Sequence, residues 1–392
     1  MDFSAVKEKV DKYVMNSYSR FNVALESGKG AKAYGCGKSY IDFGSGIGVN
    51  ALGYCDDGWV KAVSEQAAKL SHCSNLYYTP IQGELAELLC KRTGFKGVFF
   101  CNSGAEANEG AIKLARKYSF DKYGSGRATI VTLKNSFHGR TVTTLSATGQ
   151  DVFHNFFFPF TEGFKFAEAG NFDSVKEACT KDVCAVLMEP IQGEGGVLPL
   201  DTEFVKKVAD LCREKDILLM FDEVQTGIGR TGKFLAHEHF GVKADVVSCA
   251  KALAGGLPMG AVLCRDGLEN VLSAGTHATT FGGNPIACAG ALEVVKRVSD
   301  EKFLKEVTEK GEYIKARLSK IDGIGEIRGK GLMLGFDVDG VSSKDVAAKA
   351  AENGLLILTA KTALRMLPPL TITKEEIDCG LDILEDTIKS MK

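Results

Sequence analysis

One acidic side chain and one amine each follow a short apolar run of the sequence, where a buried strand would end. Residues 217–221 are apolar and precede Asp222, and residues 244–250 are mostly apolar and precede Lys251. Ligands of open α/β sheets bind at the carboxyl ends of the strands. Lys251 has small neighbours and no adjacent acid, so burial would lower its pKa and free the amine to attack a carbonyl carbon. The alternative to a buried, reactive Lys251 is an ordinary lysine at the end of a strand whose amine reaches into water.

A candidate anion site lies at residues 102–109, between a predicted strand at 97–101 and a predicted helix that extends to about Tyr118. Free backbone N–H groups and the positive end of a helix attract an anion such as phosphate. Asn102 or Ser103 could also act as an ordinary cap of the first helical N–H groups. The two roles are compatible.

Two near-motifs are rejected on their spacing. Residues 227–234 approach the phosphate-loop pattern, but Phe234 stands where a hydroxyl would have to hold Mg²⁺. His237 and His239 lack the spacing of a zinc helix, and we expect their segment to be a surface loop. The sequence therefore predicts neither nucleotide hydrolysis nor a metal site.

The order of the predicted elements indicates an α/β protein. A strand, a turn and a helix alternate from about 97 to 265, which is typical of a mostly parallel sheet covered by helices. The later part of the chain alternates differently and resembles a smaller α+β unit. We expect a large domain at residues 56–285 and a smaller domain at residues 286–392, to which residues 1–55 contribute.

The composition is that of an ordinary globular protein, with 45% apolar and 25% charged residues in 392. The net charge of -2 gives no electrostatic reason to expect a nucleic acid or an anionic membrane as partner. Twelve cysteines occur without a Cys-x-x-Cys pair, which favours reduced thiols. With no signal-peptide pattern and no apolar run long enough to span a membrane, we expect a cytoplasmic protein.

Six motifs in a fixed order resemble those of the class III pyridoxal-phosphate-dependent aminotransferases. They are NSGAEAN (102–108), FHGR (137–140), EPIQGEGG (189–196), FDEVQTG (221–227), AKAL (250–253) and TFGGNP (280–285). Within this family the chain is most similar to the acetylornithine aminotransferases, through residues 74–78 and 364–370. These two patterns grade into those of ornithine and succinylornithine aminotransferases. Ala254 stands where many relatives have glycine.

The resemblance implies a fold type I transferase, with a mostly parallel seven-stranded sheet in the large domain. It implies pyridoxal 5'-phosphate as cofactor, with Lys251 holding the cofactor aldehyde as a Schiff base and later moving a proton. Asp222 would keep the pyridine nitrogen protonated. A homodimer with shared active sites is also implied.

The remaining site residues are carried over from the same resemblance. Those expected at the cofactor are Ser103, Gly104 and Ala105 at the phosphate, Phe137 and Val224 on the ring faces, Gln225 at the phenolic oxygen, Thr280 from the neighbouring subunit, and His138 and Glu189. Those expected at the substrate are Tyr18, Arg140, Glu194 and Arg365.

The implied reaction is transamination of N2-acetyl-L-ornithine with 2-oxoglutarate, giving N-acetylglutamate 5-semialdehyde and glutamate, in arginine biosynthesis. Arg140 and Arg365 would bind the two carboxylates of glutamate, and Glu194 would pair with Arg365 when the terminal amine is bound. Alternatives are ornithine, succinylornithine or 4-aminobutyrate aminotransferases, an isomerase of the glutamate-semialdehyde aminomutase type, and a cofactor-binding protein without catalysis. Two carboxylate-binding arginines argue against the isomerase, and the intact set of catalytic side chains argues against the last.

Overall fold

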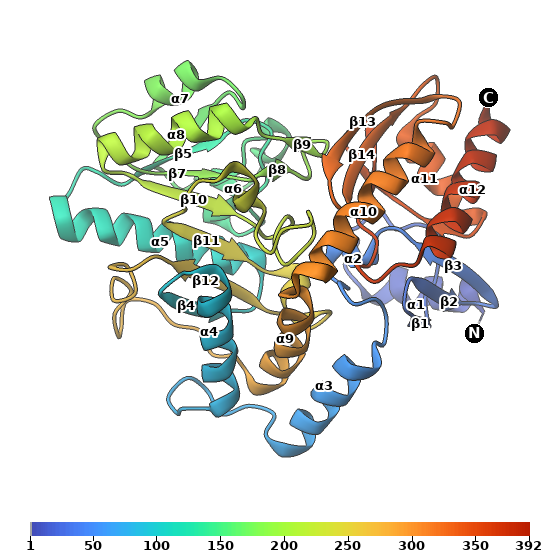
Figure 1. Cartoon of the computed structure of the whole chain (residues 1–392), viewed down its shortest axis with the longest axis horizontal. Coiled ribbons are helices and arrows are strands. Elements are labelled where there is room, and N and C mark those ends of the chain that lie inside the picture. Colours follow the sequence, from blue (N-terminus) through green and yellow to red (C-terminus); the bar gives the residue numbers. More distant parts are fainter. Residues whose placement is uncertain (1) are drawn as a thin grey trace.

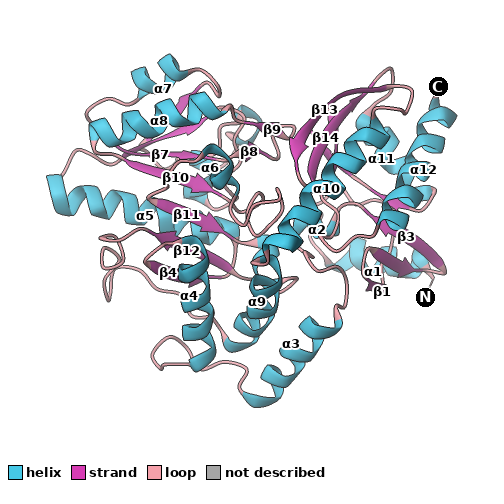
Figure 2. Ribbon diagram, in the orientation of Figure 1, coloured by secondary structure: helices cyan, strands magenta, loops and turns pink. Residues whose placement is uncertain are grey.

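The computed structural model describes residues 2–392 and contains one large sheet and two four-stranded sheets. The large sheet lies on the left of Figures 1 and 2, and the two smaller sheets lie with the last three helices on the right. In spatial order the large sheet consists of β4 (Gly97–Cys101), β12 (Gly260–Cys264), β11 (Val246–Cys249), β10 (Leu218–Asp222), β7 (Val183–Met188), β5 (Thr129–Leu133) and β6 (Phe164–Ala167).

The expectation of a mostly parallel seven-stranded sheet is confirmed. β10 pairs in parallel with both β7 and β11, and β5 pairs in parallel with β6 and β7. β12 is the exception, because it runs antiparallel to both β11 and β4. After β11 the chain reverses direction through the short 3-10 helix η3 (Lys251–Ala254) and enters the antiparallel strand β12. This reversal places residues 250–259 at the carboxyl ends of the parallel strands.

Helices cover both faces of the large sheet, so its central strands are apolar on both sides. The helices of this part are α3 (Asp57–Lys69), α4 (Pro80–Thr93), α5 (Gly104–Tyr123), α6 (Val142–Ala147), α7 (Phe172–Ala178), α8 (Thr202–Lys215) and α9 (Pro285–Val298). Alternate residues of β10 enter two different cores. Met220 packs in the core that contains the buried face of α5, and Phe221 packs in the core that contains α8. Successive side chains of β10 point to opposite faces of the sheet, and both faces are buried. This explains why residues 217–221 form an unbroken apolar run.

The two ends of the chain meet in one small sheet. It consists of β1 (Ser27–Lys29), β2 (Lys32–Gly35), β3 (Lys38–Asp42) and β15 (Leu355–Leu356). β3 and β15 are parallel, with Leu355 opposite Ile41. Helices α1 (Phe3–Tyr13) and α2 (Ser45–Gly48) flank these first strands in sequence.

The other small sheet, called here the C-terminal sheet, is antiparallel and lies beside the β8–β9 hairpin (Figure 1). Its strands are β13 (Ile324–Lys330), β14 (Met333–Val338), β17 (Ala363–Met366) and β16 (Leu358–Ala360). The hairpin consists of β8 (Ile191–Gln192) and β9 (Leu198–Pro199). The helices of this part are α10 (Glu301–Leu318), α11 (Ser343–Glu352) and α12 (Lys374–Met391). No helix among residues 2–392 is both long and apolar enough to cross a bilayer.

The segment that contains His237 and His239 is not the surface loop expected from the sequence. It forms the 3-10 helix η2 (Ala236–Phe240), and His237 is buried. The reason is Glu223, a fully buried carboxylate that needs donors: it accepts the N–H groups of Ala236 and His237 and lies 2.9 Å from His237 Nδ1. These contacts provide the buried Glu223 carboxylate with hydrogen-bond donors, so the cluster has a structural role.

Candidate active site

A cavity of about 430 Å³ opens where β10 and β11 end and α5 begins. Most of the residues expected at the site line it. They are Ser103, Gly104, Ala105, Phe137, His138, Arg140, Glu189, Asp222, Val224, Gln225 and Lys251. The topology explains this convergence, since the carboxyl ends of neighbouring parallel strands meet at one edge of the sheet.

Lys251 lies at the first position of η3, two residues after β11 ends. Its backbone has a φ of +46°, a left-handed conformation that is uncommon outside glycine and is often found at functional sites. Burial lowers the pKa of its amine to about 8, and the nearby charge of Glu194 acts in the opposite direction. Lys251 lines the cavity, and with a pKa of about 8 roughly half of its amine is neutral at pH 8.

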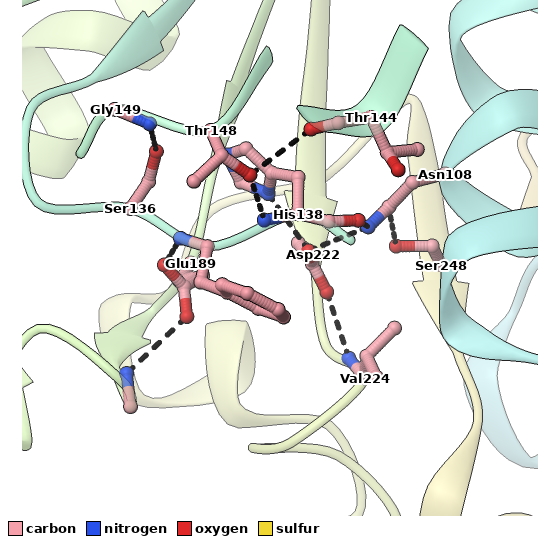
Figure 3. Close-up of polar contacts among 12 residues, drawn as sticks. Asn108, Ser136, His138, Thr144, Thr148, Gly149, Glu189, Asp222, Val224 and Ser248 are labelled. Carbon is pink, nitrogen blue, oxygen red and sulfur yellow. Dashed lines mark hydrogen bonds and ion pairs between the residues drawn. The ribbon is translucent and has the colours of Figure 1, made fainter. Parts of the chain in front are cut away.

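Asp222 is held by a network of buried side chains (Figure 3). Its Oδ2 accepts a hydrogen bond from Asn108 Nδ2 at 2.7 Å and lies 2.8 Å from His138 Nδ1. Its Oδ1 accepts the N–H group of Val224 at 3.0 Å. Three donors thus fix the plane of the carboxylate while it still lines the cavity.

Asn108 and Ser248 are functional candidates that were not assigned a role from the sequence. Ser248 Oγ donates to Asn108 Oδ1 at 2.6 Å, and Asn108 Nδ2 donates to both the His138 carbonyl and Asp222 (Figure 3). The hydroxyl therefore fixes which end of the amide faces Asp222. The available signal was one asparagine among the alanines of the buried face of α5.

The first turn of α5 provides a cradle for an anion. Ser103 caps the helix by accepting the N–H group of Glu106 at 3.2 Å. The N–H groups of Gly104 and Ala105 precede the first helical hydrogen bond, so no carbonyl of the helix can accept them. A Cβ at Gly104 would lie 2.5 Å from Val224 Cγ1, so glycine is required where the helix start approaches the opposite wall.

Arg140 is an exposed guanidinium that lies against two aromatic rings. It lies 4.1 Å from the ring centroid of Phe153 and 5.3 Å from that of Phe137. The two rings contact each other edge to face at 5.9 Å. No hydrogen bond or ion pair joins the guanidinium to any residue from 2 to 392, so its N–H donors are free to bind a carboxylate.

Arg365 is a buried guanidinium that is paired with Glu194. Its Nη1 lies 2.6 Å from Glu194 Oε1, and its Nη2 lies 3.3 Å from Oε2. Gln225 joins the pair, because its Oε1 accepts from Arg365 Nη1 at 3.1 Å and its Nε2 donates to Glu194 Oε1 at 3.3 Å. Burial alone would raise the pKa of Glu194, but the charge and hydrogen bonds of Arg365 outweigh it and lower the pKa.

Glu189 lines the cavity, but backbone groups occupy both of its carboxylate oxygens. Oε2 accepts the N–H group of Phe137 at 3.0 Å, and Oε1 accepts that of Gly193 at 3.2 Å (Figure 3). Burial, and then the charge of Asp222, raises its pKa. Glu189 therefore ties the Phe137 segment to the turn that carries Glu194.

The structure does not bring Tyr18 and Thr280 to the cavity. Tyr18 is exposed, with its ring against the guanidinium of Arg20 at 5.3 Å. Thr280 lies in a separate hollow with Asn75 and Phe99. In a single chain, therefore, neither residue lines the cavity.

Comparisons with known proteins agree on one family. Residues 13–388 match the family described as aminotransferase class-III. The chain is 47% identical to the acetylornithine aminotransferase of Haemophilus ducreyi, with 100% of both chains covered, and 48% identical to that of Aquifex aeolicus, with 96% of this chain and 100% of the relative covered. It superposes on the ornithine aminotransferase of Toxoplasma gondii with a TM-score of 0.95 at 33% identity, covering 100% of this chain and 96% of the other. The N-acetylornithine aminotransferase of Stenotrophomonas maltophilia gives a TM-score of 0.85 at 35% identity, with 98% of both chains covered.

Proposed function

The chain belongs to the class III aminotransferases, and on this premise we propose that it transfers the terminal amino group of N2-acetyl-L-ornithine to 2-oxoglutarate. The products are N-acetylglutamate 5-semialdehyde and glutamate, which places the reaction in arginine biosynthesis. The observation that carries the proposal is the contrast between two guanidinium groups: Arg140 is free and Arg365 is paired with Glu194. The relatives named acetylornithine aminotransferase favour this donor over ornithine.

The cavity fits pyridoxal 5'-phosphate, the cofactor of this family. The aldehyde requires an amine, the pyridine nitrogen a carboxylate, and the phosphate an array of N–H groups. Lys251, Asp222 and the first turn of α5 provide these three partners around one cavity, and the apolar side chains of Phe137 and Val224 line it. When bound, this cofactor withdraws electrons from the substrate carbon and so stabilises the carbanion.

The proposed catalytic work of the chain is done by two side chains. Lys251 Nζ would carry a proton between the substrate carbon that bears the amine and the cofactor, and its pKa of about 8 leaves part of the amine neutral for this task near pH 8. The Asp222 carboxylate would keep the pyridine nitrogen of the cofactor protonated, and Asn108 and His138 hold that carboxylate in place.

The two arginines explain how one pocket accepts two unlike substrates. Glutamate reacts at its α-carbon, so one carboxylate lies beside the reacting centre, where Arg365 binds it, and the distal one lies at Arg140. N-acetylornithine has a carboxylate only far from the reacting carbon, where Arg140 binds it. Arg365 would then be an unpaired buried cation, which is unfavourable, and the observed pair with Glu194 removes that cost.

The proposal includes a cytoplasmic homodimer whose two subunits complete each other's sites. It is supported by the position of Thr280 outside the cavity and by the exposed rings of residues 156–158. The division into a large domain at 56–285 and a smaller one at 286–392 and 1–55 is likewise proposed, because strands of both chain ends share a sheet. At the boundary α9 is the linking helix, and it packs against α3 and α4 of the large domain. The free cysteines suit a reducing compartment.

The direct test is to supply the purified enzyme with 2-oxoglutarate and each candidate amine, and to measure glutamate. We expect glutamate with N2-acetyl-L-ornithine at a higher kcat/KM than with ornithine or 4-aminobutyrate. An isomerase would need no 2-oxoglutarate, and a protein without catalysis would form no glutamate. Borohydride reduction should fix the cofactor on Lys251, and a label on another lysine would contradict the assigned site.

A further inference from the structure

The turn that carries Glu194, residues 193–197 of the β8–β9 hairpin, rests on a single cross-strand row of the C-terminal sheet. In this row Arg328 of β13 lies opposite Gly335 of β14, and Gly335 lies opposite Arg365 of β17. Residues directly opposite one another in an antiparallel sheet point to the same face. The three positions therefore form one continuous strip beside the turn.

Each position of the row contacts a different part of the turn. Arg365 binds the Glu194 carboxylate at 2.6 Å. Gly335 leaves room for the turn, since a Cβ at that position would lie 2.7 Å from Val197 Cβ. Arg328 Nε donates to the carbonyl of Gly196 at 2.9 Å.

Arg328 is itself rigidly held. Its Nη1 and Nη2 donate to the two carboxylate oxygens of Asp337 at 2.8 and 2.9 Å, in the bidentate geometry specific to arginine. Only 13% of the Arg328 side chain is exposed. Because Asp337 fixes the plane of the Arg328 guanidinium, Arg328 Nε points toward the turn.

The turn needs such support because its backbone is strained. Val197 has a φ of +58° and Gly196 a φ of +121°, and a β-branched residue rarely adopts a left-handed conformation. Strained backbone persists only where surrounding contacts determine it. Val197 is fully buried in a small core with Met333 and Leu367, next to the row.

We propose that Arg328 is a positioning residue that holds the 193–197 turn against the C-terminal sheet and so sets the preference between the two amino donors. The inference rests on the proposed function, in which Glu194 pairs with Arg365 during the half-reaction of the terminal amine. Without the Arg328 bond the turn is less constrained, so Glu194 leaves Arg365 more readily. Arg365 is then free more often, which favours glutamate and disfavours the donor that has no carboxylate near the reacting carbon.

The test is the substitution Arg328→Met, measured as single-turnover rates of the holoenzyme with each donor. We expect the ratio of kcat/KM for the terminal amine to that for glutamate to fall by about tenfold, the effect of losing one hydrogen bond from a charged donor. Arg317→Met is the matched control, since Arg317 is also an arginine of the C-terminal part with carboxylate partners, Asp378 and Asp382, but does not contact the turn. It should leave the ratio unchanged.

Two further variants separate this inference from the proposed function. Arg328→Lys keeps the charge but loses the fork, so it should give an intermediate ratio. In a Glu194→Ala background, Arg328→Met should have no further effect on the ratio. If Glu194→Ala alone fails to change the ratio, the proposed gate is wrong. If Glu194→Ala changes it but Arg328→Met and Arg328→Lys do not, or if both donors lose activity equally, the role of Arg328 is wrong.

Discussion

Asn108 Nδ2 donates a hydrogen bond of 2.7 Å to Asp222 Oδ2 across the boundary between α5 and β10. The same helix begins at Gly104, which lines the cavity. One element thus provides the proposed phosphate site at its start and, one turn later, the side chain that orients the proposed partner of the pyridine nitrogen. The relative position of the two sites is therefore set by helix geometry, not by a flexible loop.

Replacing Asn108 should weaken cofactor binding. In Asn108→Ala the carboxylate of Asp222 loses one of its three donors, so we expect the dissociation constant for pyridoxal 5'-phosphate to rise by about tenfold. Equilibrium dialysis of the enzyme, followed by absorbance, measures this. Ser248→Ala should give a smaller change in the same direction, because Ser248 acts through the asparagine. Unaltered affinity in both variants would show that the network does not position Asp222.

The reactivity of Lys251 should depend on pH with a midpoint near 8. Only the neutral amine attacks a carbonyl, and burial lowers the pKa of Lys251 to about 8 from the ordinary 10.5. Capture of an aldehyde by the cofactor-free enzyme should therefore be slow below pH 8, rise through it and level off above it.

The charge of Glu194 raises the pKa of Lys251, so Glu194→Gln should move this midpoint to lower pH. Glu168→Gln, which changes an exposed acid paired with Lys134, is the control and should not move it. A midpoint above pH 10 in the unmodified protein would mean that the lysine is solvated.

Removing the Glu194 carboxylate should affect the two half-reactions unequally. Breaking one side of a buried ion pair costs about 3–5 kcal/mol, and in Glu194→Ala that cost falls only on the state in which Arg365 has no substrate carboxylate. The half-reaction with N2-acetyl-L-ornithine should slow by at least about tenfold, while that with glutamate is unchanged or faster. Stopped-flow absorbance with each donor measures this, and equal losses would assign Glu194 a purely structural role.

Phe153 should contribute to the binding of 2-oxoglutarate through Arg140. An exposed guanidinium such as that of Arg140 gains about 0.5–1 kcal/mol from a contact with a ring face. Phe153→Leu should therefore raise the KM for 2-oxoglutarate by about two- to fivefold with little change in kcat. Phe153→Tyr keeps the ring and should preserve KM. The control is Phe120→Leu, because Phe120 is exposed near the end of α5 and does not line the cavity. A fall in kcat at constant KM would contradict this role.

The positions of Asp222 and Lys251 were predictable because fully buried strands appear as wholly or mostly apolar runs. The runs at 217–221 and 244–250 correspond to β10 and β11, and each candidate residue follows its run directly. The start of α5 was predictable for a similar reason, since a capping serine and a glycine precede a series of good helix formers.

Other features depend on contacts between distant residues and have no local signal. The antiparallel direction of β12 was not predicted, because a buried strand has the same apolar pattern whether it is parallel or antiparallel to its neighbours. The burial of His237 depends on Glu223, and the support of the Glu194 turn depends on Arg328, which is more than 130 residues away in sequence. Such relations follow from the topology of the sheets rather than from the pattern of any one segment.

The pairing of β3 with β15 has a consequence for how the chain folds during synthesis. β3 ends at Asp42, and its parallel neighbour begins at Leu355, so the ribosome must produce most of the chain before this edge can be paired. An unpaired strand edge is prone to association with other chains. The nascent protein therefore has an exposed edge throughout most of its translation, and we expect chaperone binding to concentrate on the first 42 residues until the last strands emerge.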